Sequence, residues 1–323
     1  MNINHNFETD ICWVLEESKK RIQSYHPCMS DMGISYMEKR HILAEKGKRS
    51  CEFYWLTPFW LQDTFDLDQE SCRTISLATV YMVLYFLSQD EVMDSSHSDY
   101  NGYLLPLSNM FYLDFISQYR KLFNSDSPFW LYVEKYTNEW AESVLWERRE
   151  HWGQAENYSE NDLILLSRKA AGIKIPFAAA CILSGNESYI ESLAAMVDYD
   201  QVVYQLYDDW RDWKIDLEQS NYTYFLTEAK KYCNISDPSL LKEEDIKKAV
   251  FEGKVLQKVL KISEKFNKLA SESIANINSA YLKNYIDNQK KICIDDPIRD
   301  VLMEKYGITS MRLGSLLRES IDD

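Results

Sequence analysis

The sequence predicts an all-α protein. Only 9 glycines and 7 prolines interrupt its 323 residues, which is few for a chain of this length. Apolar residues recur at helical spacing over long stretches, and no stretch shows the apolar–polar alternation of a half-buried strand. A chain of this size can bury a large core. We therefore expect one domain, residues 1–323, folded as a helical bundle of about ten helices.

The N-terminal helices follow from apolar spacing and from the residues that interrupt it. Helices are expected over about residues 9–25 and 31–45, on either side of His26-Pro27. The aromatic segment over about 55–68 contains Pro58, so it is predicted to be a loop or a short helix.

The next helix, over about residues 69–94, contains the longest apolar run of the chain. That run, Ile75 to Leu87, is too short to span a bilayer and indicates a buried helix. Later breaks are marked by Pro and Gly residues. The remaining helices are expected over about 105–123, 128–151, 160–183 and 189–217, with charged helix over 239–321 that breaks near Pro297 and Gly307.

Charge and cysteine content exclude several classes of function. A net charge of −15 leaves no basic face for nucleic-acid phosphates and disfavours an anionic membrane surface. The seven cysteines are scattered, odd in number and without a Cys-x-x-Cys pair, which favours reduced thiols over disulfides or a zinc site. The sequence shows no signal peptide and no transmembrane segment, so we expect a cytoplasmic protein.

Three aspartates, Asp208, Asp212 and Asp216, are spaced four residues apart in an expected helix. Each step of four turns a helix by only about 40° and rises about 6 Å, so the three carboxylates project from one stripe. Like charges at this spacing destabilise a helix, and a divalent cation would neutralise them. The opposite face is apolar and carries Val202, Leu206, Trp210, Trp213 and Leu217. An amphipathic helix with a solvated acidic side is therefore an equally good interpretation of this motif alone.

A second acidic element, Asp90-Glu91-Val92-Met93-Asp94, places Asp90 and Asp94 four residues apart. Such a pair is also common on protein surfaces. Its position directly after the apolar run, however, places it at the mouth of whatever that helix lines. Two carboxylate-lined helix walls can hold Mg²⁺ against a diphosphate, which is our interpretation of the two acidic elements.

A third element combines two adjacent cations, Arg168 and Lys169, with Gly172. A glycine within a helix costs about 1 kcal/mol relative to alanine, so a local bend is expected here. A bend beside two cations suits an anion site. Taken alone, a snorkelling arginine and a packing glycine explain the same residues.

Together these elements resemble a known superfamily. The segment from Gln205 to Asp212 is similar to the second aspartate-rich motif of trans-prenyl diphosphate synthases, phenylalanine-Gln-x-x-Asp-Asp-x-x-Asp, with Tyr204 in place of the phenylalanine. The triad that begins at Asp208 also has the spacing of the metal ligands of microbial terpene cyclases. The element that begins at Asp90 resembles the first aspartate-rich motif.

The cationic element resembles the cyclases as well. Arg168 and Gly172 fall where cyclases carry a diphosphate-sensing arginine and a helix-breaking effector glycine. The resemblance covers about residues 45–220 and is specific at the two acidic motifs. It implies the class I isoprenoid synthase fold, with an active-site cavity inside a helical bundle.

The resemblance also implies a metal-dependent site for a prenyl diphosphate. Three Mg²⁺ ions would be held by two groups of ligands, namely Asp90, Glu91 and Asp94 on one helix and Asp208, Asp212 and Asp216 on another. The metals and Arg168 would stabilise the departing diphosphate so that the allylic C–O bond ionises. The residues assigned to catalysis are Asp90, Asp208 and Arg168. The residues assigned to diphosphate binding are Arg168, Lys169, Gly172, Arg211 and Lys214.

The prenyl tail and the cation left behind need a dry, aromatic-lined cavity. Tyr85 and Phe86 lie about one helical turn before Asp90, where bulky side chains in the superfamily close the bottom of the prenyl pocket. Tyr204 and Gln205 are assigned to the same pocket. We expect a C10 to C20 substrate.

The sequence favours a cyclase over an elongating enzyme. Elongating synthases usually follow the first motif with an Arg-Arg pair for a second diphosphate, and the residues here are Asp99 and Tyr100. We therefore expect a terpene synthase that ionises an allylic diphosphate and releases diphosphate with cyclisation or quenching of the cation. The segment Gly47-Lys48-Arg49 and Gln205 are similar to features of elongating enzymes, so a trans-prenyl diphosphate synthase or prenyltransferase remains the alternative. The C-terminal Arg-Tyr pair of many cyclases is absent, and Arg312 is its only candidate substitute.

Two further classes differ in what they require. A ferritin-like di-metal bundle needs two Glu-x-x-His pairs, and only Glu38 to His41 has that spacing, so this class is rejected. A non-catalytic helical binding protein stays possible and predicts no Mg²⁺-dependent release of diphosphate. A homodimer is implied by the superfamily resemblance alone.

Overall fold

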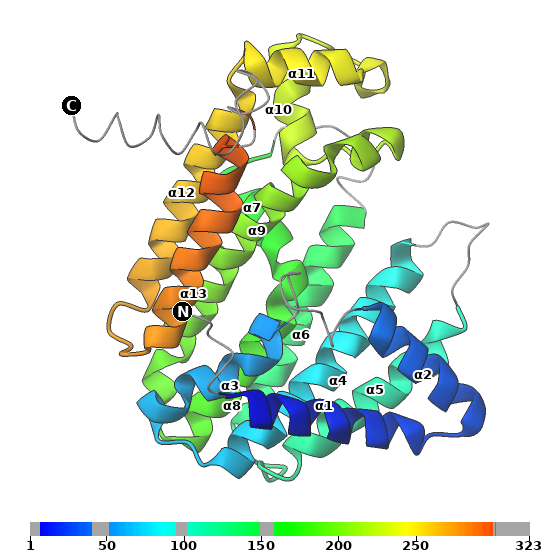
Figure 1. The fold of residues 1–323 in the computed structure, drawn as a ribbon, viewed down its shortest axis with the longest axis vertical. Coiled ribbons are helices and arrows are strands. Elements are labelled where there is room, and N and C mark those ends of the chain that lie inside the picture. Colours follow the sequence, from blue (N-terminus) through cyan, green and yellow to red (C-terminus); the bar gives the residue numbers. More distant parts are fainter. Residues whose placement is uncertain (1–6, 41–51, 95–101, 149–157, 300, 302–323) are drawn as a thin grey trace. The chain divides into compact units, whose positions relative to one another are not determined.

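The computed structural model of the protein describes residues 7–40, 52–94, 102–148, 158–299 and 301, and these residues form helices joined by turns (Figure 1). The all-helical class predicted from the sequence is confirmed. The chain divides into two compact units. The first is Met1–Trp140, Ala170–Ala194 and Asn276–Leu282, and the second is Ala141–Lys169, Ala195–Ala275 and Lys283–Asp323.

The first unit is organised around a long apolar helix, α4. Its helices are α1 (Glu8–Gln23), α2 (Pro27–Lys39), α3 (Glu52–Phe65), α4 (Gln69–Asp94), α5 (Leu104–Tyr119), the first part of α6 (Phe129–Trp146) and α8 (Lys174–Leu183). Every residue of α4 from Ile75 to Leu84 is buried, as the apolar run predicts. The helices α4 and α5 run side by side in Figure 1 and make extensive contact.

A buried carboxylate anchors α1 to α5 within this unit. Asp114 of α5 is 2% exposed and accepts hydrogen bonds from Tyr25 Oη at 2.5 Å and Arg21 Nε at 2.8 Å. By length and composition α4 is the one helix among the described residues that could cross a membrane, over Gln69–Met93. Because 78% of that window is buried inside the structure, α4 is accounted for as a core helix.

The second unit is organised around α9. Helix α9 (Ile190–Glu218) begins in the first unit and continues through the second. The other helices of the second unit are α7 (Glu160–Ser167), α10 (Tyr224–Tyr232), α11 (Glu243–Phe251), α12 (Val255–Ser273), most of α13 (Ala280–Lys290) and the π-helical turn η6 (Lys291–Asp295). The helices α12 and α13 lie side by side (Figure 1), and Asn267 Nδ2 donates to the backbone oxygen of Ile286 at 3.2 Å.

The observed helices differ from the expected ones in three places. The segment with Pro58 is a full helix, α3, because its aromatic residues are core: Trp55, Phe59 and Trp60 are buried. The helix expected over 160–183 is interrupted by a 3-10 segment, η3 (Arg168–Ile173), at the predicted glycine bend. Helix α10 was not expected, because only nine residues separate its caps.

Candidate active site

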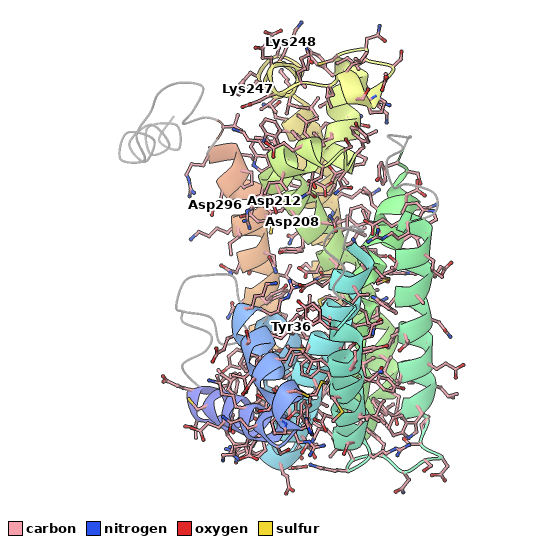
Figure 2. All side chains as sticks on the ribbon, turned by 90° about the vertical axis from the view of Figure 1, so that its right-hand side faces the viewer. Tyr36, Asp208, Asp212, Lys247, Lys248 and Asp296 are labelled. Carbon is pink, nitrogen blue, oxygen red and sulfur yellow. The ribbon has the colours of Figure 1, made fainter. Side chains whose placement is uncertain are left out.

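The aspartate stripe lies on the C-terminal half of α9. Asp208, Asp212 and Asp216 are each half-buried, and Figure 2 labels the first two, one turn apart on this helix. The opposite face packs into the core of the second unit, as predicted: Val202 and Leu206 are buried, and Trp210, Trp213 and Leu217 pack against the same core. The stripe is therefore a fixed surface of a well-anchored helix.

Asp209 points the other way and is buried at 2% exposure. Its Oδ1 accepts a hydrogen bond from Gln205 Nε2 at 2.9 Å. Burial is the main reason that the pKa of Asp209 rises to about 7, and the charges of Asp216 and Asp208 add to the rise. The Gln205 hydrogen bond and the backbone amide of Phe225, at the start of α10, partly oppose it. Gln205, expected to line a substrate pocket, thus holds Asp209 in this structure.

Asp216 is held by the turn that follows α9. Asn221 Nδ2 donates to Asp216 Oδ1 at 2.9 Å, and the backbone N–H of Asn221 donates to the backbone oxygen of Asp216 at 2.8 Å. Burial raises the pKa of Asp216 to about 6, the charges of Asp212 and Asp208 add to the rise, and the Asn221 hydrogen bond opposes it. The neighbouring carboxylates of the stripe thus disfavour the ionised form of Asp216.

The two cations of α9 assigned to diphosphate binding are both exposed. Lys214 Nζ pairs with Glu243 of α11 at 3.2 Å, and the Arg211 guanidinium lies 5.6 Å from the ring centroid of Tyr207. In this structure each cation thus has a contact with a residue outside the aspartate stripe. Tyr204 is half-buried on the same helix.

The first acidic motif closes α4 in the first unit. Asp90 is half-buried, and Asp94 is the last residue of the helix, with a side chain outside the described part of the structure. Glu91 accepts hydrogen bonds from Arg40 and, at 3.2 Å, from Lys39. The carboxylate of Glu91 therefore already binds two cations that sequence reasoning did not connect with it.

An aromatic cluster lies one turn before Asp90. The Phe86 ring is 4.9 Å from the Trp140 ring and 5.0 Å from the Tyr85 ring, and Tyr85 lies 5.2 Å from Tyr112, between ring centroids. The edge of the Phe86 ring also lies against Gly172. The structure thus brings Gly172 against Phe86, a residue more than eighty positions earlier in the sequence.

The cationic segment forms η3, directly after α7. Lys169 Nζ pairs with Glu147 at 2.8 Å, and Arg168 Nε lies 3.7 Å from Asp198 Oδ2. Both cations are about one-third exposed. They are therefore accessible to an anion that competes with these carboxylates. The segment Gly47-Lys48-Arg49, the residues Asp99 and Tyr100, and Arg312 lie outside the described residues.

The donors of the acidic motifs suit a hard divalent cation. All are carboxylate oxygens, which Mg²⁺ prefers, and Mg²⁺ usually takes one or two carboxylates together with waters and phosphate oxygens. Within the described residues, no three His, Cys, Asp or Glu side chains converge on one point. The three aspartates of the stripe therefore do not form a three-carboxylate cage, and a cation bound to any of them would need further oxygen ligands.

No protein-family model matches the sequence, and no curated protein matches it either. Solved structures do match. A polyprenyl synthase from Caulobacter crescentus CB15, complexed with calcium and isoprenyl diphosphate, has a TM-score of 0.72 at 13% identity, over 90% of this chain and 96% of that one. A decaprenyl diphosphate synthase from Rhodobacter capsulatus has a TM-score of 0.72 at 12% identity, over 91% and 98%.

A geranylgeranyl pyrophosphate synthetase from the archaeon Geoglobus acetivorans is also similar, with a TM-score of 0.68 at 16% identity, over 89% of this chain and 98% of that one. Identities this low establish the fold alone. The chain has the all-helical class I isoprenoid synthase fold of the trans-prenyl diphosphate synthases, as its two acidic motifs predict.

Proposed function

We propose that the protein is an enzyme that ionises an allylic prenyl diphosphate with the help of Mg²⁺. The observation that carries this proposal is the aspartate stripe of α9, Asp208, Asp212 and Asp216, in a chain with the fold of prenyl diphosphate synthases. An ordinary amphipathic surface helix would leave its acidic side chains exposed to solvent. Asp216 is instead half-buried and accepts a hydrogen bond from Asn221. That arrangement favours a ligand site.

In this proposal the carboxylates of each acidic motif act as Mg²⁺ ligands within their own unit, Asp90 and Asp94 in α4 and the three aspartates of the stripe in α9. Bound Mg²⁺ supplies positive charge that stabilises the departing diphosphate. A cation also favours the ionised form of Asp216, whose pKa is raised in its absence. Glu91 would join the ligands only by exchanging Arg40 and Lys39 for the metal.

In the proposal the cations of η3 act as donors to the diphosphate. Arg168 and Lys169 would donate to diphosphate oxygens, exchanging their present partners Asp198 and Glu147 for the ligand. Charge that develops on the leaving group is then met by fixed donors, which is the usual source of catalysis for such a step. The aromatic faces of Tyr85 and Phe86 would enclose the apolar tail.

Two reactions of the ionised substrate are compatible with this site. The similar structures are synthases of polyprenyl, decaprenyl and geranylgeranyl diphosphates, which favours condensation of the allylic cation with a second prenyl substrate. Cyclisation is the second candidate. One observation favours it, the presence of Asp99 and Tyr100 where elongating enzymes carry two arginines.

The test uses the purified full chain with geranyl, farnesyl and geranylgeranyl diphosphate and Mg²⁺, each with and without isopentenyl diphosphate. A longer prenyl diphosphate that forms only with isopentenyl diphosphate establishes condensation. A hydrocarbon or alcohol that forms without it establishes cyclisation or quenching. Either product must disappear when the metal is chelated. A protein that yields neither product and releases no diphosphate would be a non-catalytic helical protein.

A further inference from the structure

The ring of Phe86 occupies the space that a side chain at position 172 would need. A Cβ built on Gly172 would lie 2.5 Å from Cε2 and 2.9 Å from Cδ2 of Phe86. Carbon atoms in ordinary contact are about 3.5–4.0 Å apart, so any other residue at position 172 requires a shift of about 1 Å. Phe86 belongs to α4 and Gly172 to η3, and both lie in the first unit.

The ring is confined on its other sides as well. Trp140 of α6 and Tyr85 of α4 have ring centroids 4.9 Å and 5.0 Å away. Phe86 nevertheless retains 9% exposure, so one part of its surface is open. A ring pushed away from η3 must therefore move toward that open side or displace Trp140. In a close-packed environment such a shift displaces the neighbouring side chains.

The position of Phe86 connects this contact with the site. Phe86 precedes Asp90 by four residues, so the two side chains share one face of α4, about 40° and about 6 Å apart. A ligand that presents its diphosphate to Asp90 and lays its apolar tail along this face reaches the Phe86 ring within its first few carbons. Gly172 lies four residues after Arg168 in the same 3-10 segment.

We propose that Gly172 is a specificity-determining residue. Because it has no side chain, the Phe86 ring can lie against η3, and this position of the ring sets the length of prenyl tail that fits beyond Asp90. This inference rests on the proposed function, because it takes a prenyl diphosphate as the ligand. In this role Gly172 contacts the Phe86 ring and not the diphosphate. If the ring shifts toward its open side in Gly172→Ala, it shortens the space along this face of α4, and the variant is expected to select for shorter tails.

The experiment measures binding, so it does not depend on turnover. Full-length wild-type protein, Gly172→Ala, Phe86→Ala and the double variant are titrated calorimetrically, in Mg²⁺, with the non-ionising thiolodiphosphate analogues of C10, C15 and C20 prenyl diphosphates. In Gly172→Ala the affinity for the C20 analogue is expected to fall about tenfold relative to the C10 analogue. In the Phe86→Ala background, adding Gly172→Ala should change that ratio by less than about twofold, because the added methyl group then meets no ring.

Gly253→Ala provides a matched control. A Cβ at Gly253 would collide with the ring of Tyr232 at 2.6 Å, a comparable clash in the second unit that involves neither acidic motif. This variant should leave the ratio of the affinities for the C20 and C10 analogues unchanged. If Gly172→Ala does not fold, rescue of folding by Phe86→Ala supports the contact, and a double variant that also fails to fold overturns it.

The outcomes separate this inference from the proposed function. A wild-type protein that binds the analogues, together with a Gly172→Ala variant whose length profile is unchanged, overturns the role of Gly172 and leaves the proposed function intact. An effect of Gly172→Ala that persists at full size without the Phe86 ring overturns it too. A wild-type protein that binds none of the three analogues contradicts the proposed function itself.

Discussion

Asn221 Nδ2 donates a hydrogen bond to Oδ1 of Asp216 at 2.9 Å, across the turn that joins α9 to α10. The backbone N–H of the same residue donates to the backbone oxygen of Asp216 at 2.8 Å, so two hydrogen bonds join Asn221 to Asp216. One oxygen of the carboxylate is thereby oriented and the other is left for a different partner. Partners of this kind commonly orient the ligands of a metal site.

If Asp216 binds Mg²⁺, Asn221→Ala should raise the Mg²⁺ concentration for half-maximal diphosphate release by about tenfold, because the carboxylate loses its orienting donor. Asn186→Ala is a suitable control, since Asn186 Nδ2 makes a similar local bond to Ser184 outside the acidic motifs. An unchanged Mg²⁺ requirement in a folded Asn221→Ala protein would show that Asn221 serves the turn alone.

Removing one charge from the stripe should slow diphosphate release far more than removing a nearby charge. Asp212→Asn keeps the size of the side chain and should slow diphosphate release by about 100-fold or more, because metal stabilisation of the leaving group is weakened. Glu218→Gln removes an exposed charge from the end of the same helix and should leave the rate within about twofold. Equal effects of the two variants would assign the loss to overall charge and not to the stripe.

A buried ion pair in the first unit should matter for stability. Lys174 is 2% exposed, donates to Glu139 Oε2 at 2.6 Å and lies 5.5 Å from the ring centroid of Tyr136. Lys174→Met leaves Glu139 without this cation and should lower the free energy of unfolding by about 3 kcal/mol. The double variant with Glu139→Gln should recover most of that loss. Denaturant unfolding checks both values, and a double variant as unstable as Lys174→Met would contradict the pairing.

The free energy of unfolding should depend on pH through Glu228 of α10. Burial works against its ionised form, but hydrogen bonds from Lys231 and Lys258 prevail, so the pKa of Glu228 lies below its usual value. A lowered pKa in the folded state means that the contribution is present above the unfolded value, about 4.5, and is lost as the pH falls through the folded value. Glu228→Gln should therefore cost about 1–3 kcal/mol at pH 7 and progressively less below pH about 4.5. The measurement is urea unfolding of both proteins across this range, and a difference that does not change with pH would contradict it.

The periodic part of the fold was readable from the sequence. The apolar run Ile75 to Leu87 predicted the core of α4, and the spacing from Val202 to Leu217 predicted which face of α9 is buried. Both predictions depend only on residues within one helix. The bend at Gly172 was also expected, although its extent, a complete 3-10 segment, was not.

The parts that were missed depend on residues far apart in the chain. The burial of Asp209 depends on α10, and the sequence offers no strong apolar run there. The partner of Lys174 lies on α6, and the cations that hold Glu91 lie on α2. The contact of Phe86 with Gly172 joins α4 to η3. One sequence gives the spacing along a helix but not the neighbour that the helix meets.

Mg²⁺-dependent ionisation of an allylic diphosphate is tested most directly by the rate at which the purified chain releases inorganic diphosphate as Mg²⁺ is titrated. With farnesyl diphosphate, or with its C10 or C20 counterpart, the proposed function predicts release that saturates in Mg²⁺, stops with a chelator and is lost in Asp212→Asn. Absence of release from all three substrates, with and without isopentenyl diphosphate, would contradict it.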